Sequence, residues 1–462
     1  MRAGRKSVSA CSLLGVAVVL LGWFSAPPTA MHAGQAGQNA VWGSTGTVNS
    51  RAFIDATPFY GTNGNDICAV ISYILTSVVN PNTPPPNGVV IDARGVPLTS
   101  ACSQNPIPPP PSCNGNPCPI FSIVVLLPPG TITVSQTWTL PSNTRIVGEG
   151  SNLTALQVGS SGFQNAAMIQ MGGTDPNNNQ PYCLNAQGAS SCVGVGIEHL
   201  RLDGGSGNGP LIGVDNAYSE ELSYVNDVAL TNLGGIGLRL RSSGLSGVSA
   251  VNSGPYSDIY YSGSGTCAKI NGTYDTRGIH GLTCNMTGSS SAAVYVDGSN
   301  NSIEDVYIQG SVTDGILVGS VNSAQGNLLA NVNGGGTSLT NLIHISSQAG
   351  NVSDLTILGA TCAGCTNTIY DELTPPTLLT SASNANVGMY VIGEPVYSNG
   401  SASYYSFFTS SPSVPTWLVG SATPSGSCAT GQLYSTTSSA TYTLWACAAS
   451  TTQGSGTWVH IM

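Results

Sequence analysis

A short apolar strand pattern recurs through the middle of this chain, and it restricts the fold more than any other feature of the sequence. One series of strands reads LIGVD, GIGLRL, AAVYVDG, DGILVGS and NLIHISS, and a second reads LSYVNDVAL, SGVSAV, SIEDVYIQG, GNLLANV and VSDLTILG. The matching positions Val294, Ile316 and Ile343 are 22 and 27 residues apart. A period in this range, with short strands and no helix between them, predicts a solenoid whose coils stack in parallel.

The burial of apolar side chains explains why such coils stack. One coil cannot bury its own apolar face, whereas stacked coils build a continuous column of Val, Ile and Leu. Asn-rich turns agree with this fold, because side-chain amides at one place in successive turns can hydrogen-bond to each other. A β-sandwich is the alternative, but it would show hairpin signals and strict alternation. We therefore expect an all-β, single-stranded parallel β-helix over residues 50–400.

The segment before the repeat differs from the coils. Residues 65–79 place their apolar side chains on one stripe of a helix, with Asn65 or Asp66 as N-cap. We expect this helix to cap the N-terminal end of the apolar column, which would otherwise be an open sheet edge. The Pro-rich residues 80–119 predict a loop, held in place by Cys102, Cys113 and Cys118.

The N-terminus has the layout of a secretory signal peptide. Arg2, Arg5 and Lys6 precede an apolar run that ends at Trp23, and small residues follow, so we assign residues 1–33 to the signal. A membrane anchor is the alternative, although the run is short for a membrane span. Loss of the three leader cations changes the net charge from -10 to -13. This charge argues against nucleic acid or a membrane as partner of the mature chain.

The cysteines indicate an oxidising compartment. Of the 13 cysteines, Cys11 lies in the leader, which leaves an even number in the mature chain. Closely spaced cysteines predict three disulfides: Cys183 with Cys192, Cys267 with Cys284 and Cys428 with Cys447. Zinc at the Cys362-Ala-Gly-Cys365 segment is the alternative, but no second C-x-x-C completes a tetrahedral site. We predict no metal or cofactor, and a Ca²⁺ ion has no support in the residues.

The end of the chain has a different composition. Residues 401–419 form a linker, and the Ser/Thr-rich residues 420–462 predict a small module of two or three antiparallel strands. So small a module has little core of its own, so the Cys428–Cys447 disulfide would be its main constraint.

Three segments in order suggest a family. GTNGNDICAVISYI, then NGVVIDARGV, then VVLLPPGTITVSQTWTLPSNTRIVGEGSNLTALQ resemble the start of the pectate-lyase-superfamily, polygalacturonase-related (glycoside hydrolase family 28-like) β-helix proteins, and VYVDGSNNSIEDVYIQGSVTDGILVGS is similar to their later coils. The resemblance spans roughly residues 52–375. It implies a right-handed β-helix with a capping helix, and polysaccharide as the substrate class.

The catalytic motifs of that family are not reproduced. Asp314-Gly315-Ile316 is only a faint counterpart of its N-T-D motif, Gly278-Ile279-His280-Gly281 is a distorted match to G-H-G, and no Asp-Asp pair exists. Lys269 is the sole lysine after the leader. The resemblance therefore implies a carbohydrate-facing scaffold more firmly than any reaction.

Carboxylates that recur at one coil position are best explained as turn residues. His199, Asp227, Asp305 and Asp354 all precede the last apolar strand of their coil, so we interpret them as structural. A second column alternates with buried apolar residues, and its side chains should stand on one face of adjacent coils. We predict that this column binds the substrate, with ordinary solvated side chains as the alternative: Asp215, Arg239, Arg241, Tyr295, Asp297 and His344.

The least repeat-like stretch, residues 254–287, predicts an excursion loop closed by Cys267 and Cys284. It collects chemistry-bearing residues, from which we predict catalytic Asp258, Asp275, Arg277 and His280 and sugar-binding Tyr260, Tyr261 and Tyr274. Asp258 and Asp275 would serve hydrolysis, which needs two carboxyl groups, whereas Arg277 and His280 would serve elimination from a uronic acid. A purely structural loop is the alternative.

These features favour a secreted protein that hydrolyses or eliminates glycosidic bonds in a pectin-like or other acidic polysaccharide. The alternative is a non-catalytic carbohydrate-binding protein, adhesin or tailspike-like surface protein, which the missing family motifs and the appended C-terminal module favour.

Overall fold

The computed structural model describes residues 52–372 with internal gaps, and shorter segments beyond them. The gaps are 80–84, 86, 110–111, 114–115, 118–120, 160–162, 164–166, 175–181, 184–190, 207–210, 244–251, 275, 277, 337, 349–351 and 354; the later described segments are 389–392, 403–405, 417–420, 424, 433–438, 441–448 and 457–461. The signal segment 1–33, Cys118 and Cys428 lie outside the described residues. Of the described helices, none has the length and apolar character to cross a membrane.

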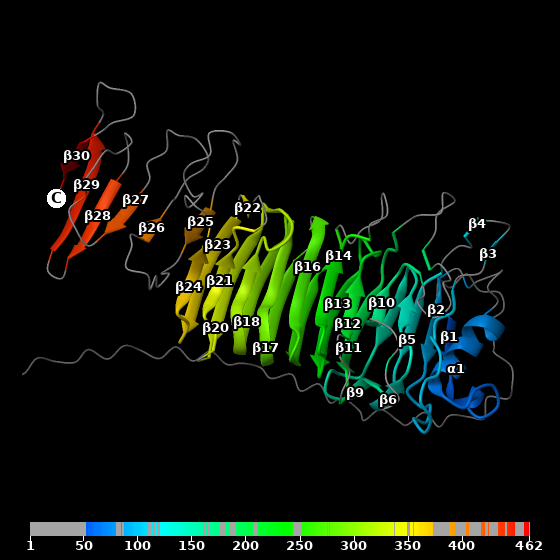
Figure 1. The fold of residues 1–462 in the computed structure, drawn as a ribbon. Coiled ribbons are helices and arrows are strands. Elements are labelled where there is room, and N and C mark those ends of the chain that lie inside the picture. The colour runs from blue at the N-terminus through cyan, green and yellow to red at the C-terminus, as the bar shows by residue number, and fades with distance from the viewer. Residues whose placement is uncertain are drawn as a thin grey trace, which may run out of the picture. The chain divides into compact units, whose positions relative to one another are not determined.

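A parallel β-solenoid makes up the body of the chain (Figure 1). Its strands form three ladders, each running from coil to coil. Ladder 1 contains β7 (Trp138–Leu140), β10 (Ala167–Met171), β12 (Ile212–Asn216), β14 (Ile236–Arg241), β16 (Thr266–Tyr274), the second halves of β17 (Ile279–Ser299) and β18 (Ser302–Val318), β21 (Asn341–Ile345) and β24 (Asn367–Asp371).

Ladders 2 and 3 meet at a bend inside one strand of each later coil. Ladder 2 starts with β1 (Ala52–Asp55), β2 (Val89–Asp92), β5 (Ile123–Leu126) and β8 (Thr144–Val147), and ladder 3 starts with β6 (Gly130–Val134) and β9 (Thr154–Val158). In the later coils one strand contributes its first half to ladder 2 and its second half to ladder 3. These strands are β11 (Gly196–Asp203), β13 (Tyr224–Thr231), β15 (Tyr256–Gly263), the first halves of β17 and β18, β20 (Leu328–Gly335) and β23 (Leu355–Ala363). The last strand of ladder 2 is β25 (Met389–Ile392).

The register confirms the predicted repeat. Val294 pairs with Ile316, and Ile316 pairs with Ile343, in neighbouring parallel strands. All three side chains are fully buried in one apolar core that runs through the coils. Burial of such side chains is favourable by about 25 cal/mol per Å² of apolar surface, so every added coil shields its neighbours.

A column of left-handed residues marks the bend between ladders 2 and 3. His199, Asp227, Asp258, Asp305 and Asn331 have φ between 49° and 56° and occupy the same place in successive coils, with Gly281 and Gly359 in the remaining two. Asn and Asp tolerate this conformation because their short polar side chains bond locally. The turn position predicted for His199, Asp227 and Asp305 is confirmed; Asp354 lies outside the described residues, and Gly359 takes the bend in its coil.

The predicted excursion loop at 254–287 is wrong. Its described residues form β15, β16 and the start of β17, which pair with the coils on both sides. The period was obscured because Tyr256 and Tyr261 fill inward positions that neighbouring coils give to Val225, Ile279 and Leu230. Cys267 is fully buried as well. Large and sulfur-containing side chains satisfy the same core as aliphatic ones.

The N-terminal helix forms where predicted. α1 (Ile67–Tyr73) continues as a π-helical turn, Ile74–Val78, and the Asp66 carboxylate accepts a hydrogen bond from the Ala69 backbone N–H as the N-cap. Ile67, Ile71 and Ile74 belong to the solenoid core, so the helix covers the apolar column near β1.

Disulfides join segments of one coil or of adjacent coils. The predicted pairs Cys183–Cys192 and Cys267–Cys284 are both present, and Cys362 pairs with Cys365 instead of binding zinc. Cys102 pairs with Cys68 of α1 and not with a cysteine of the Pro-rich loop, because Cys68 faces the core side of the helix.

The C-terminal segments form a separate five-stranded sheet. It contains β26 (Ser403–Tyr405), β27 (Trp417–Gly420), β28 (Leu433–Ser438), β29 (Thr441–Ala448) and β30 (Thr457–His460), antiparallel except for the β27–β28 pair. Two of its strands thus lie N-terminal to residue 420, in the segment predicted as a linker.

Candidate functional site

The outward positions of ladder 1 carry a mixed polar row, which we call the ladder 1 row. Coil by coil the register aligns these side chains: Gln170, Asp215, Arg239, Lys269, Tyr295, Leu317, His344 and Tyr370. Adjacent strands are about 4.8 Å apart, so the row is a line of evenly spaced groups. The predicted column of Asp215, Arg239, Tyr295 and His344 is therefore aligned as expected, and Lys269 joins it.

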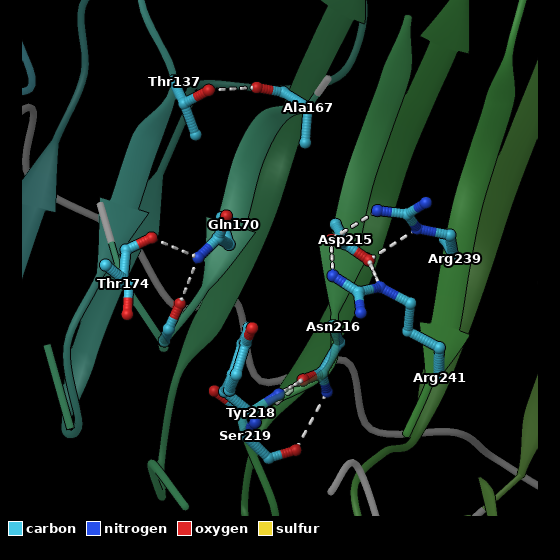
Figure 2. Close-up of polar contacts among 11 residues, drawn as sticks. Thr137, Ala167, Gln170, Thr174, Asp215, Asn216, Tyr218, Ser219, Arg239 and Arg241 are labelled. Carbon is cyan, nitrogen blue, oxygen red and sulfur yellow. Dashed lines mark hydrogen bonds and ion pairs between the residues drawn. The ribbon is translucent and has the colours of Figure 1, made fainter. Parts of the chain in front are cut away.

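One buried carboxylate holds two arginines in this row (Figure 2). Asp215 is 3% exposed, and it accepts hydrogen bonds from Arg239 Nε (2.8 Å) and one of its terminal nitrogens (2.7 Å). Arg241 makes the same two contacts at 3.1 and 3.0 Å. Burial would raise the pKa of Asp215, but the hydrogen bonds and charges of the two arginines outweigh it and lower that pKa. The carboxylate therefore stays ionised and fixes both guanidinium groups in place.

The cations outnumber their carboxylate here. Arg239 and Arg241 share one buried acid and keep 24% and 29% of their side chains exposed, and Lys269 lies beside Arg239 on the next strand. The Lys269 ammonium lies 5.0 Å from the ring centre of Tyr295, and the Arg241 guanidinium lies 6.0 Å from that of Tyr218. Such cation–π contacts orient the charges without neutralising them. We call Arg239, Arg241 and Lys269 the cationic group.

A histidine between two acids lies three coils further along the row. His344 Nδ1 donates to Asp314 (2.9 Å), Nε2 lies 3.1 Å from Glu372, and the Tyr370 ring packs at 5.0 Å. Burial would lower the pKa of His344, but Asp314 and Glu372 outweigh it and raise that pKa above 6.5. The pKa of Glu372 is lowered, since Ser347 and His344 outweigh its burial. The protonated imidazole can donate a proton, and the carboxylate beside it can accept one.

Two predicted ligand-binding residues belong to the interior. Tyr261 is fully buried, its hydroxyl donates to the Leu233 carbonyl oxygen at 3.0 Å, and burial raises its pKa to about 12. Asp297 is also fully buried and accepts hydrogen bonds from the backbone N–H groups of Ser320 and Val321. Tyr261 was predicted at the surface because its strand was assigned to an excursion loop. Asp297 keeps the predicted register, but Ser320 and Val321 cover it, so the structure corrects both predictions.

The predicted catalytic residues are not gathered into one site by the described part of the chain. Asp258 is a bend residue, exposed and equivalent to the structural Asp227, while Tyr260 is exposed on ladder 3. His280 is on ladder 2, where its Nδ1 lies 3.7 Å from Glu304. Asp275, Arg277 and the side chain of Tyr274 lie outside the described residues.

Sequence inspection missed Asp314 and Glu372 as partners of His344. They are separated from it by 30 and 28 residues, about one coil on either side. The signal that could have found them is the repeat itself: Asp314 falls two residues before Ile316, and Glu372 follows the strand that aligns Tyr370 with His344.

Comparisons with known proteins do not assign the chain to a family. No family model and no curated protein matches the chain. Among solved structures, Geobacillus virus E2 ORF18 is similar at 12% identity, over 80% of this chain and 76% of that one, with a TM-score of 0.35. The A-modules of the Azotobacter vinelandii mannuronan C-5 epimerases AlgE4 and AlgE6 match at 12% and 14% identity, over 59% and 60% of this chain and 91% of each module, with TM-scores of 0.28 and 0.22. The chain is a parallel β-helix protein, and the pectate-lyase and glycoside-hydrolase assignments remain resemblances.

Proposed function

We propose that the protein binds an acidic polysaccharide along the ladder 1 row, with uronate carboxylates paired to the cationic group. The observation that supports this is the position of Arg239, Arg241 and Lys269 on two adjacent coils of one outward face, in a chain with 21 acidic and 11 basic residues. Guanidinium groups recognise carboxylates through paired N–H donors. The buried Asp215 binds the Nε and one terminal nitrogen of each arginine, and this holds the remaining N–H groups in place before any ligand arrives, which reduces the entropy lost on binding.

A polymer suits this face better than a small molecule. The row offers one side chain at each inter-strand spacing of about 4.8 Å, so an extended chain of sugars can contact several coils at once. Tyr295 supplies an aromatic surface next to Lys269. Each contact alone contributes little affinity, but several contacts to one polymer chain together give stable binding.

Charge removal tests this proposal. We expect Lys269→Ala and Arg241→Gln each to weaken binding of polygalacturonate by about tenfold, which corresponds to about 1.4 kcal/mol, and to reduce its salt dependence. Isothermal titration at two salt concentrations measures both. The matched control is Arg94→Gln, which removes the same charge from an arginine that pairs with Asp92 and Glu149 away from the row. Equal losses in Arg94→Gln and Arg241→Gln would contradict the proposed site.

A second candidate function is cleavage of the bound polysaccharide, which the position of His344 between Asp314 and Glu372 favours. In hydrolysis, the imidazolium would protonate the leaving glycosidic oxygen while Glu372 accepts a proton from the attacking water. In elimination, a base takes the C5 proton and the imidazolium protonates the departing oxygen. Products distinguish the two: both create reducing ends, and only elimination creates an unsaturated uronate that absorbs in the ultraviolet.

The raised pKa of His344 sets the expected pH dependence of cleavage. Because the proton donor is the imidazolium, turnover should be highest below the raised pKa and fall as the pH rises through it, above the ordinary 6.5. His344→Ala should lower turnover about 10²-fold or more while polygalacturonate binding is retained. If the wild-type chain binds polygalacturonate, alginate and xylan but releases no ends, the binding-only function holds and the cleavage proposal fails.

We also propose that the protein is exported. The support is the leader of residues 1–33 together with disulfides, which persist in oxidising compartments. N-terminal sequencing of secreted material checks both the export and the cleavage point.

A further inference from the structure

Ladder 3 presents a second outward face with a different chemistry. After Ala155, Arg201 and Ala229, its first outward row continues, coil by coil, with Tyr260, Thr283, Tyr307, Asn333 and Thr361. The two tyrosines are 41% and 42% exposed, whereas Tyr256 and Tyr261 of the same region are fully buried. Two large rings thus stand on a flat sheet with one threonine between them.

From Ser262 onward, the second outward row of this face is also polar and uncharged. It aligns Ser262, Asn285, Gln309 and Gly335. Among these nine described positions none carries a charge. The side chains bond to each other and not to charged groups: Thr361 donates to Asn333 at 2.6 Å, and the Tyr307 hydroxyl donates to Gln309 at 3.4 Å. We call the nine positions the ladder 3 face.

The border of the ladder 3 face is acidic. Asp258 and Asp305 are exposed bend residues that precede Tyr260 and Tyr307 by two positions each. These carboxylates would repel a uronate placed on the tyrosines, and the cation that shares their row, Arg201, lies two coils before Tyr260. The face therefore disfavours the ligand that the cationic group of ladder 1 favours.

We propose that the ladder 3 face binds a neutral, extended β-1,4-linked polysaccharide, with Tyr260 and Tyr307 stacked on alternate sugar rings. The rings lie two inter-strand spacings apart, roughly 10 Å, and in such a glycan every second sugar presents the same face. Tyrosine offers a rigid apolar surface at a small entropic cost. The hydroxyl and amide groups of Thr283, Asn285 and Gln309 lie beside the rings and can replace the water bound to sugar hydroxyls.

This second surface is independent of the proposed acidic-polysaccharide site. The two faces belong to different ladders of the same coils, so one chain could hold an acidic and a neutral polymer together. A protein built this way would anchor itself on a neutral wall polymer while it contacts an acidic one.

Adsorption to regenerated amorphous cellulose and to β-mannan tests the inference with the full mature chain. We expect measurable retention on at least one polymer, a loss of about tenfold or more in Tyr260→Ala/Tyr307→Ala, and recovery in Tyr260→Phe/Tyr307→Phe, because a phenyl ring still stacks. Both tyrosines are exposed, so unchanged circular dichroism and melting temperature should accompany the loss. Tyr295→Ala, a tyrosine of ladder 1, is the matched control and should leave retention unchanged.

Three results would overturn it: no retention of the wild-type chain on either polymer, full retention in the double alanine variant, or an equal loss in Tyr295→Ala. Sedimentation velocity adds a fourth, since a dimer that dissociates in the double variant would make the face a contact between two copies. Failure here is distinguishable from failure of the proposed function, because the latter is measured on polygalacturonate with Arg241→Gln and Lys269→Ala.

Discussion

Replacement of Asp215 by alanine lowers the free energy of unfolding by about 3–5 kcal/mol, the range for removing one partner of a buried ion pair. The carboxylate is 3% exposed and accepts four hydrogen bonds from Arg239 and Arg241. Without it, two guanidinium groups remain side by side with no acid between them, so their repulsion adds to the lost hydrogen bonds. Urea denaturation followed by circular dichroism measures the difference.

The matched control for this prediction is Asp203→Ala. Asp203 is also buried, at 8% exposure, but its neighbours are the neutral Gln157, Asn232 and the Gly205 backbone N–H. Its removal leaves no cation without a partner. The free energy of unfolding should therefore fall by clearly less, about 1–3 kcal/mol. Equal destabilisation by the two variants would show that the ion pairs of Asp215 with Arg239 and Arg241 contribute no more to the free energy of unfolding than neutral hydrogen bonds do.

The contribution of Asp215 to the free energy of unfolding should also depend on pH. Its folded pKa lies below its ordinary value, so its contribution is present above the unfolded pKa of about 3.9 and disappears as the pH falls through the lowered folded value. In Asp215→Ala this part of the acid dependence should be missing, while the acid dependence due to other carboxylates persists.

Removal of the Cys267–Cys284 disulfide, by alanine at both positions, has the second large effect. The bond joins residues separated by 17 in sequence, and for a loop of this length about 3 kcal/mol of stability is expected from the restricted unfolded chain. Both cysteines are fully buried in the solenoid core, so lost packing adds to the effect. Differential scanning calorimetry should show a lower melting temperature.

Cys362–Cys365 provides the comparison. It closes a segment of three residues, and both cysteines are only partly buried. A disulfide that closes so short a loop constrains the unfolded chain much less. Alanine at both positions should therefore lower the melting temperature only slightly. A larger effect here than at Cys267–Cys284 would contradict this account.

Much of the fold was predictable because the determining signals are local or strictly periodic. The N-cap Asp66 and the apolar stripe of α1 lie within a few turns of chain, so helix physics alone identifies them. The alignment of Val294, Ile316 and Ile343 follows from a repeat that the core imposes on each coil. Short spacing likewise identified Cys183–Cys192 and Cys267–Cys284.

The candidate site was predictable only in part, because side chains on neighbouring coils meet according to register. The outward column of Asp215, Arg239 and His344 could be seen in the alternation, but Asp258 was assigned to catalysis although it occupies the same bend as Asp227. The cause was the assignment of residues 254–287 to an excursion loop, which removed one coil from the count.

The sequence by itself determined that coils stack and that their Val, Ile and Leu side chains face inward, since burial of an apolar column requires the same pattern in every turn. The tertiary structure alone decided which distant side chains touch. His344 meets Asp314 and Glu372, and Tyr260 aligns with Thr283 and Tyr307, only through the pairing of whole strands. One shifted or miscounted coil would exchange every such neighbour while leaving the apolar pattern of each strand unchanged.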